Sequence, residues 1–251
     1  QSHEIATAVR QPVREIVAKY GGDVKIVEVP PGPPVLSTIV AEIYGPDYKK
    51  QIEVADEVQQ ILNSTKDVVD IDWMVEADQT EYDFVMDREK AMLYGISPEQ
   101  ITKTLRTVLT ETPVTHLYDE TATNQVGIHL ALEEKEASDL ASLRSIQIRS
   151  QQGNMVPLGD LVDIRQDIIE KSIFRKNQKR VVYVMADMAG ELESPVYAIL
   201  GISDALKEIQ LPKGYQLDEL YIRQPDFEDN YTVKWDGEWQ ITLEVFRDLG
   251  M

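Results

Sequence analysis

The sequence predicts an α+β fold built on a split β-α-β sheet that is interrupted by an inserted α+β domain. Two strand-helix-strand patterns, over residues 35–75 and 180–222, are the first observation. The second is the segment between them, about 81–169, which carries helices and strands of its own. The third is a proline-rich run at 30–34 just before the first pattern. Together they predict one sheet with both helices on a single face and a second domain inserted into it.

Composition narrows the classes of function. The chain has 251 residues, of which 44 are acidic and 25 basic, and a formal net charge of -19. This charge repels phosphate backbones, so a nucleic-acid partner is not expected. The absence of cysteine excludes disulfides, thiolate zinc sites and cysteine nucleophiles. At 43% hydrophobic residues the chain can fill a core, but no stretch approaches the roughly 18 consecutive apolar residues of a membrane helix.

The first segment predicts a helix, a short strand and a proline-rich joint. Apolar residues recur at helical spacing over 4–17, and Gly21-Gly22 is a plausible stop. The β-branched residues of 24–29 predict a strand. Four prolines then exclude both helix and sheet hydrogen bonding, which predicts a stiff hinge or domain boundary, with a rigid surface loop as the alternative. These prolines are Pro30, Pro31, Pro33 and Pro34.

The first β-α-β pattern covers residues 35–75. A β-branched run over 35–44 predicts a buried strand. Gly45-Pro46-Asp47 then opens a helix whose apolar stripe extends to Leu62. A strand over 67–75 completes the unit.

The second pattern lies far downstream. Residues 180–188 predict a strand, and Ser194-Pro195 supplies an N-cap and a first-turn proline for a helix through Ile209. A strand follows at 215–222, after a Pro-Lys-Gly turn. The two halves therefore predict a split sheet of the ferredoxin-like kind.

The insert begins with an alternating strand at 82–86. Residues 87–90 open a short helix that Gly95 closes, and Ser97-Pro98 caps the next helix. Further strands are expected at 113–118 and 125–132, which form a hairpin, and at 146–149, 155–158 and 161–168.

The residue composition changes from Gln224 onward. Acidic residues precede Trp235 and Trp239, and an amphipathic stretch follows over 239–249. Aromatic residues beside an amphipathic end are typical of a membrane surface, and packing into the core is the alternative.

No catalytic constellation stands out. His116 and His129 are placed to face each other across the predicted hairpin, where they are either a metal site or surface histidines. No phosphate-binding loop, nucleophile elbow or carboxylate pair is present. These observations favour a binding or mechanical role over an enzyme and imply no cofactor. Met74, beside Trp73 at the end of a strand, is a candidate soft-metal ligand.

Several short motifs recur in a specific order. The insert opens with Tyr-Asp-Phe-Val-Met-Asp-Arg-Glu-Lys-Ala and a Gly-Ile-Ser helix start, Val156-Pro157-Leu158 follows, and Arg175-Lys176-Asn177 marks the return. Together with the proline hinge and the split sheet, this order resembles the large periplasmic segment of resistance-nodulation-division (RND) efflux transporters. The segment in question lies between the seventh and eighth membrane helices, and the resemblance covers nearly the whole chain.

The resemblance implies a division into subdomains. Residues 1–34 resemble part of the first porter subdomain of the transporter's second half. Residues 35–79 and 170–222 resemble the second porter subdomain, interrupted by a docking subdomain at 80–169. Residues 223–251 resemble the lead-in to the eighth membrane helix.

The resemblance also implies a substrate cleft between the two porter subdomains. One wall falls on Lys25, Val27 and Val29, with Pro30 at its end, and the other on Trp73 and Met74. Drug-exporting members commonly have phenylalanines on the first wall and an arginine where Trp73 falls. This chain has aliphatic residues and a tryptophan, so the resemblance does not imply a polyaromatic drug pocket. The proline hinge would join the two subdomains at the cleft.

The main functional hypothesis is therefore the periplasmic porter and docking region of a proton-driven RND permease that exports amphipathic small molecules. The alternatives are a copper- or silver-exporting relative, with Met74 as one ligand, and an interaction module unrelated to transport. The resemblance further implies a homotrimer in the bacterial inner membrane, this segment facing the periplasm. Its partners would be a periplasmic adaptor protein and an outer-membrane channel.

Overall fold

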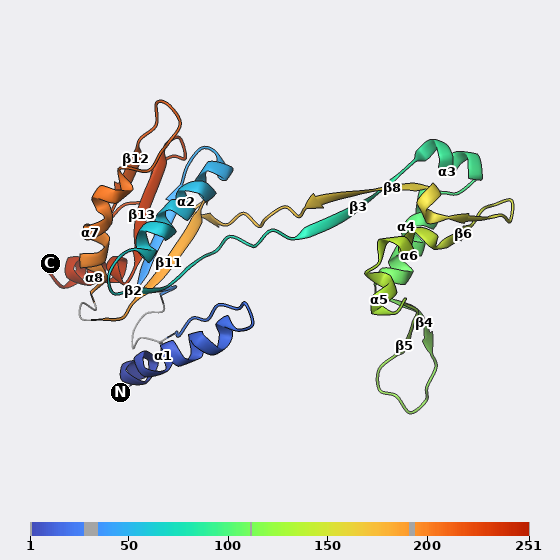
Figure 1. Cartoon of the computed structure of the whole chain (residues 1–251), viewed down its shortest axis with the longest axis horizontal. Coiled ribbons are helices and arrows are strands. Elements are labelled where there is room, and N and C mark those ends of the chain that lie inside the picture. The colour runs from blue at the N-terminus through green and yellow to red at the C-terminus, as the bar shows by residue number, and fades with distance from the viewer. Residues whose placement is uncertain (1, 28–34, 111, 191–193, 251) are drawn as a thin grey trace. The chain divides into compact units, whose positions relative to one another are not determined.

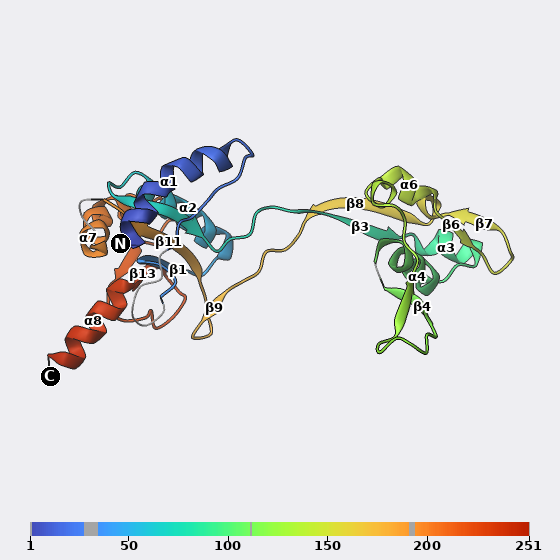
Figure 2. The ribbon, with the colours of Figure 1, turned by 90° about the horizontal axis from the view of Figure 1, so that it is seen from below.

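The computed structural model describes residues 2–27, 35–110, 112–190 and 194–250. The chain divides into two compact units, shown in Figures 1 and 2. Unit 1 comprises residues 1–77 and 171–251, and unit 2 comprises residues 78–170. Each unit has a hydrophobic cluster of its own.

Unit 1 is a five-stranded sheet with helices packed against it. The strands lie in the order β12-β13-β1-β11-β2. Its elements are α1 (Ser2–Ala18), β1 (Ile39–Tyr44), α2 (Tyr48–Asn63), β2 (Val68–Trp73), β9 (Arg175–Lys176), β10 (Lys179–Arg180), β11 (Val182–Met188), α7 (Pro195–Leu206), β12 (Leu217–Leu220), β13 (Tyr231–Gly237) and α8 (Glu238–Leu249).

The two predicted strand-helix-strand halves are both present. They are β1-α2-β2 and β11-α7-β12. All neighbouring strands pair antiparallel except β12 and β13, which are parallel. Without β13, the remaining order β12-β1-β11-β2 is that of a split β-α-β sheet. α2 and α7 lie side by side on one face, as Figure 1 shows.

β13 adds a strand that was not predicted from the sequence. Residues 223–251 were expected to form the lead-in to a membrane helix; within this segment, residues 231–237 form a strand between β12 and β1 that is buried almost throughout. Apolar Tyr231, Val233 and Trp235 alternate with polar residues at a period of two, which is the pattern of a strand with one face on the core.

Trp235 anchors β13 beneath the helices. Its side chain is fully buried, and its indole Nε1 donates to Oε1 of Glu219 on β12 at 2.7 Å. Ser203 of α7 donates to the other carboxylate oxygen at 2.6 Å. Trp239 packs against Tyr221 and donates to its carbonyl oxygen. Of the two interpretations of the tryptophan pair, core packing is confirmed.

Gly237 permits the sharp exit from β13. Its φ is +80°, and a Cβ there would lie 2.6 Å from the carbonyl oxygen of Ser37. Only glycine tolerates both the backbone angle and this close approach. α8 begins at the next residue and extends from the end of β13, as Figure 2 shows. Val245, Phe246 and Leu249 are exposed on it.

α1 is tied to β2 through charged side chains. Asp70 of β2 is buried with a φ of +52°, and it pairs with Arg10 and with Arg14, the latter at 2.8 Å. The backbone N–H of Ile26 donates to the same carboxylate at 3.2 Å. The strand predicted at 24–29 is therefore wrong over 24–27, because this segment bonds to a side chain rather than to a strand ladder.

Part of the predicted site lies outside the described residues. Val29 and the four prolines of the expected hinge, Pro30, Pro31, Pro33 and Pro34, belong to this group.

Unit 2 is built from short elements around a small core. These are β3 (Thr80–Met86), α3 (Arg88–Tyr94), α4 (Pro98–Leu109), β4 (Pro113–Leu117), β5 (Val126–His129), α5 (Glu134–Ala137), α6 (Leu140–Ser145), β6 (Gln147–Arg149), β7 (Met155–Pro157), the 3-10 turn η1 (Leu158–Asp160) and β8 (Val162–Ile168). β3 pairs with β8, β4 with β5, and β6 with β7, each antiparallel.

Local sequence signals set the helix ends of unit 2. Asp87 caps α3, and Gly95 ends it with a φ of +63°. Ser97 and Gln100 form the expected capping box of α4. α5 follows Glu133, which makes no side-chain capping hydrogen bond, whereas Asp139 caps α6.

Among the helices of the described residues, none combines the length and the apolar character needed to cross a membrane.

We expect the truncated chain 1–222 to lose the fold of unit 1. It lacks β13, so β12 loses its partner and three core side chains disappear, each worth about 1.5–3 kcal/mol. A total loss of that size rivals the usual net stability of about 5–15 kcal/mol. Limited proteolysis should cleave within 35–75. The control chain 1–240 keeps β13 and should resist; equal resistance of both chains would refute the central role of β13.

Residues 78–170 should fold alone, because β3 and β8 bring their ends together: Ile169 N–H donates to the Gln79 carbonyl at 2.9 Å. Urea denaturation should show one cooperative transition. Leu158→Ala, at a fully buried position, should lower the free energy of unfolding by about 2–5 kcal/mol. Leu117→Ala, at a position 55% exposed, should leave it nearly unchanged. A non-cooperative melt of the excised segment would contradict this.

Candidate functional site

The face of the sheet opposite α2 and α7 carries a polar cluster. Side chains alternate along a strand, so when Ile43, Val184 and Trp235 face the helices, their neighbours face the other way. Register places Glu42 of β1 between Tyr183 of β11 and Lys234 of β13. We define this polar cluster as Glu42, Tyr44, Lys176, Tyr183, Lys234 and Asp236.

Glu42 is the centre of the polar cluster. Its side chain is fully buried and accepts hydrogen bonds from Tyr44 Oη at 2.8 Å and Gln224 Nε2 at 3.2 Å. Lys176 pairs with Glu42 and, at 2.5 Å, with Asp236. Lys234 Nζ lies 3.6 Å from the other oxygen of Asp236. Two lysines thus face two carboxylates, which balances the charge.

A tight turn delivers Lys176 to this cluster. β9 and β10 pair through Lys176 and Lys179, and the two residues between them, Asn177 and Gln178, have φ of +50° and +68°. Two consecutive left-handed residues define a type I′ hairpin, for which asparagine is favoured at the first position. The Arg-Lys-Asn motif at the return from the insert therefore serves to present an ammonium group to the sheet.

Burial and pairing move the pKa values in opposite directions. Burial raises the pKa of Glu42, and its hydrogen bond with Asp236 adds to that rise against the Lys176 ammonium. Burial alone would raise the pKa of Asp236 too, but hydrogen bonds with Glu42 and Lys176 lower it to about 2. Burial, followed by the charge of Glu42, raises the pKa of Tyr44 and of Tyr183. Burial opposes the charged form of Lys176, yet its carboxylate partners raise its pKa overall.

The predicted cleft residues are only partly brought together. Lys25 Nζ donates to the carbonyl of Ile71 at 2.9 Å, so it lies against the outer edge of β2. Val27 is 76% exposed. Trp73 is partly buried against the hydrophobic core, and Met74 extends the ladder by donating its N–H to Tyr183. Lys25 and the β2 wall are thus adjacent, whereas Trp73 turns part of its ring inward.

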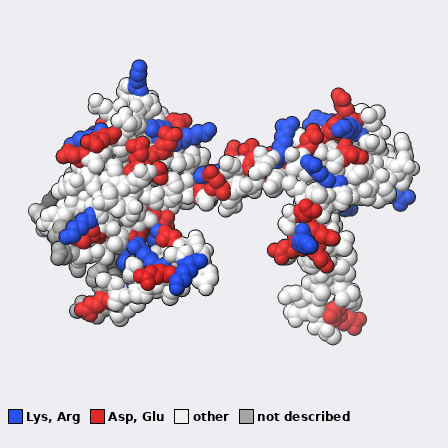
Figure 3. Space-filling view, viewed as in Figure 1, with Lys and Arg blue, Asp and Glu red and all other residues white. Residues whose placement is uncertain are grey.

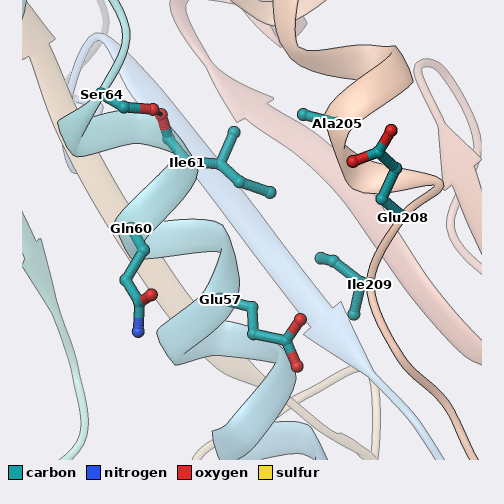
Figure 4. A pocket seen from close by; sticks show the side chains of 7 residues that line it. All are labelled: Glu57, Gln60, Ile61, Ser64, Ala205, Glu208 and Ile209. Atoms are coloured by element: carbon teal, nitrogen blue, oxygen red, sulfur yellow. Dashed lines mark hydrogen bonds between the residues drawn. The ribbon is translucent and has the colours of Figure 1, made fainter.

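A shallow groove lies between α2 and α7, and Figure 4 shows it from close by. Its volume is about 270 Å³, below the usual range of ligand pockets. Ile61 and Ile209 point toward each other across it, and Glu57 and Glu208 stand at its sides. The remaining lining residues are Gln60, Ser64 and Ala205. The groove includes none of the predicted site residues.

Two further expectations concern charge and metals. Figure 3 shows acidic and basic side chains interspersed over the visible face rather than gathered into a basic patch. Within the described ranges, no group of three or more His, Asp or Glu is arranged to hold a metal ion. The polar cluster was not predicted from the sequence; its signal there is a glutamate and a lysine that interrupt apolar strand segments, at Glu42 and Lys234.

Comparison with known proteins identifies the relatives of this chain. Residues 23–220 match the AcrB/AcrD/AcrF family. The nickel and cobalt resistance protein CnrA of Cupriavidus metallidurans is 24% identical over 187 residues, which is 73% of this chain and 17% of CnrA. The swarming motility protein SwrC of Bacillus subtilis is 22% identical over 209 residues, 83% of this chain and 18% of SwrC. The nickel-cobalt-cadmium resistance protein NccA of Alcaligenes xylosoxydans xylosoxydans is 25% identical over 192 residues, 73% of this chain and 17% of NccA.

A solved structure has the same fold. The crystal structure of a heavy metal efflux pump aligns with a TM-score of 0.63 at 19% identity, covering 85% of this chain and 21% of the pump chain. This chain thus spans less than a quarter of the length of these relatives. Because the family match covers most of the residues, including β1, β2, β11 and the whole insert, the chain belongs to the AcrB/AcrD/AcrF family of RND transporters and is not an enzyme.

Proposed function

We propose that this chain is the periplasmic porter and docking region of an RND permease that exports divalent transition-metal cations. The observation that carries the proposal is the family match over 23–220, together with two relatives named for nickel and cobalt resistance. In this proposal unit 1 holds porter elements and unit 2 is the docking subdomain. The prolines at 30–34 would join the two porter subdomains.

The metal alternative is better supported than the main hypothesis of amphipathic small molecules. Two of the three relatives are named for metal resistance, and one for swarming motility. Their metals are nickel, cobalt and cadmium rather than copper or silver. Met74 is the only thioether among the cleft candidates, and one thioether does not make a soft-metal site. The remaining ligands would come from other parts of the longer transporter.

The contacts of the five-stranded sheet in unit 1 suit this sheet to moving as a rigid body. Lys176 fixes the return from unit 2 to the buried carboxylates of Glu42 and Asp236. Alternating opening of a porter cleft requires sheets that keep their shape while the angle between them changes. Proton transfer in distant membrane helices would then favour one arrangement over another.

The assembly belongs to the same proposal. A homotrimer in the bacterial inner membrane would place this segment in the periplasm, with an adaptor protein and an outer-membrane channel as partners. α8, with Phe246 and Leu249 exposed, would lead to the next membrane helix.

Export is tested with the whole transporter in a host lacking its own metal exporters. Expression should raise the tolerated concentrations of nickel, cobalt or cadmium several-fold and leave efflux of a cationic dye unchanged. Met74→Leu should not alter nickel tolerance, and Met185→Leu on β11 is its matched control. Dye efflux without metal tolerance would contradict metal export and favour the export of amphipathic small molecules. Silver tolerance that is lost in Met74→Leu would instead favour a copper- or silver-type exporter.

The polar cluster generates a pH-dependent prediction for the 251-residue chain. The folded pKa of Asp236 is about 2, below the ordinary 3.8. The contribution of Asp236 to the free energy of unfolding is therefore fully present above pH 3.8 and is lost as the pH falls toward 2. Asp236→Asn should lower the free energy of unfolding at pH 7 by on the order of 2 kcal/mol, and by less at pH 3. Urea denaturation at both pH values measures this difference.

Glu42→Gln is the matched control, because the pKa of Glu42 is shifted upward, opposite to the downward shift of Asp236. Any stability linked to that raised pKa is present at low pH and lost as the pH rises through it. Its replacement should therefore destabilise the chain less at pH 7 than Asp236→Asn. Equal losses at both positions, independent of pH, would contradict the described electrostatics of the cluster.

A further inference from the structure

The hairpin of β4 and β5 stands apart from the core of unit 2. Both strands are exposed along nearly their whole length, and within the described part of the chain they pair with each other and with no third strand. Neither strand contains a charged residue other than histidine. A two-stranded hairpin without a third strand or a packed face is marginally stable in water. An additional link between its strands would therefore have a measurable effect.

Two histidines share one face of this hairpin. His116 of β4 lies directly opposite Gly127 of β5. Gly127 and His129 are two residues apart on the same strand, so they point to the same face. His116 and His129 are therefore diagonal neighbours, a separation that aromatic side chains span. Both side chains are exposed to solvent.

The contacts around Gly127 place the ring of His129. A Cβ at position 127 would lie 2.9 Å from Nε2 of His129. The imidazole of His129 thus leans back over Gly127, toward the residue that faces His116 across the ladder. Since glycine has no side chain, the imidazole of His129 can occupy the space over Gly127, the residue that pairs with His116.

We propose that His116 and His129 bind a divalent transition-metal cation and so bridge β4 to β5. Imidazole nitrogens suit nickel, cobalt, copper and zinc, whereas magnesium and calcium prefer oxygen ligands. Two protein ligands leave the other coordination positions to water, which reaches both exposed rings. This site is on unit 2 and does not include the predicted cleft residues, so its test is independent of the test of the proposed function.

Isothermal titration of the 251-residue chain, without a polyhistidine tag, tests the site. Nickel chloride should bind one ion per chain, cobalt chloride more weakly, and magnesium chloride not at all. His116→Gln and His129→Gln should each weaken nickel binding at least about tenfold, the order expected for a disturbed metal site. His3→Gln controls for the remaining histidine and should bind like the unaltered chain. Binding that survives the double variant would overturn the proposal.

Gly127→Ala tests the geometry with both histidines in place. The added Cβ would meet His129 Nε2 at 2.9 Å and Pro113 Cβ at 3.0 Å, so nickel affinity should fall. Hydrogen exchange gives a second readout. Nickel should protect the amides of 113–129 in the unaltered chain but not in His116→Gln. Nickel binding without such protection, or unchanged affinity in Gly127→Ala, would refute a bridge between the strands.

Discussion

The pairing of β13 with β1 is the interaction on which unit 1 depends. It places β1 in the middle of the sheet and gives the edge strand β12 its partner. It also sends side chains to both faces: Trp235 enters the core beneath α7, and Lys234 and Asp236 enter the polar cluster. A single strand therefore completes the hydrophobic core and the electrostatic pairing at once. That is why residues so close to the end of the chain are among its most deeply buried.

The polar cluster explains how an insertion of 78–170 leaves the sheet intact. The chain leaves from β2 and returns through a type I′ hairpin whose Lys176 reaches two carboxylates on different strands, Glu42 and Asp236. Removing one partner from such a buried set leaves an uncompensated charge, which costs more than the pair itself contributes. The cluster thus specifies where the returning segment sits.

Family membership and site chemistry rest on different observations. The family follows from a match over 23–220 and from a shared fold. The cleft residues were carried over from the resemblance and stay a prediction; in the structure Lys25 lies against β2, and Trp73 is partly buried against the core. The proposed export of metal cations rests on the names of relatives whose chains are much longer than this one. Each of these conclusions therefore has its own test.

The sequence by itself determined the local structure. Short-range hydrogen bonding sets the capping box at Ser97 and the left-handed helix stop at Gly95. Side-chain periodicity sets both strand-helix-strand halves. Only the tertiary structure decided that 231–237 enters the sheet and that 24–27 does not. Both are choices of partner between segments distant in sequence, and periodicity carries no information about partners. For the same reason Glu42 and Lys176, 134 positions apart, became a pair only once the chain had folded.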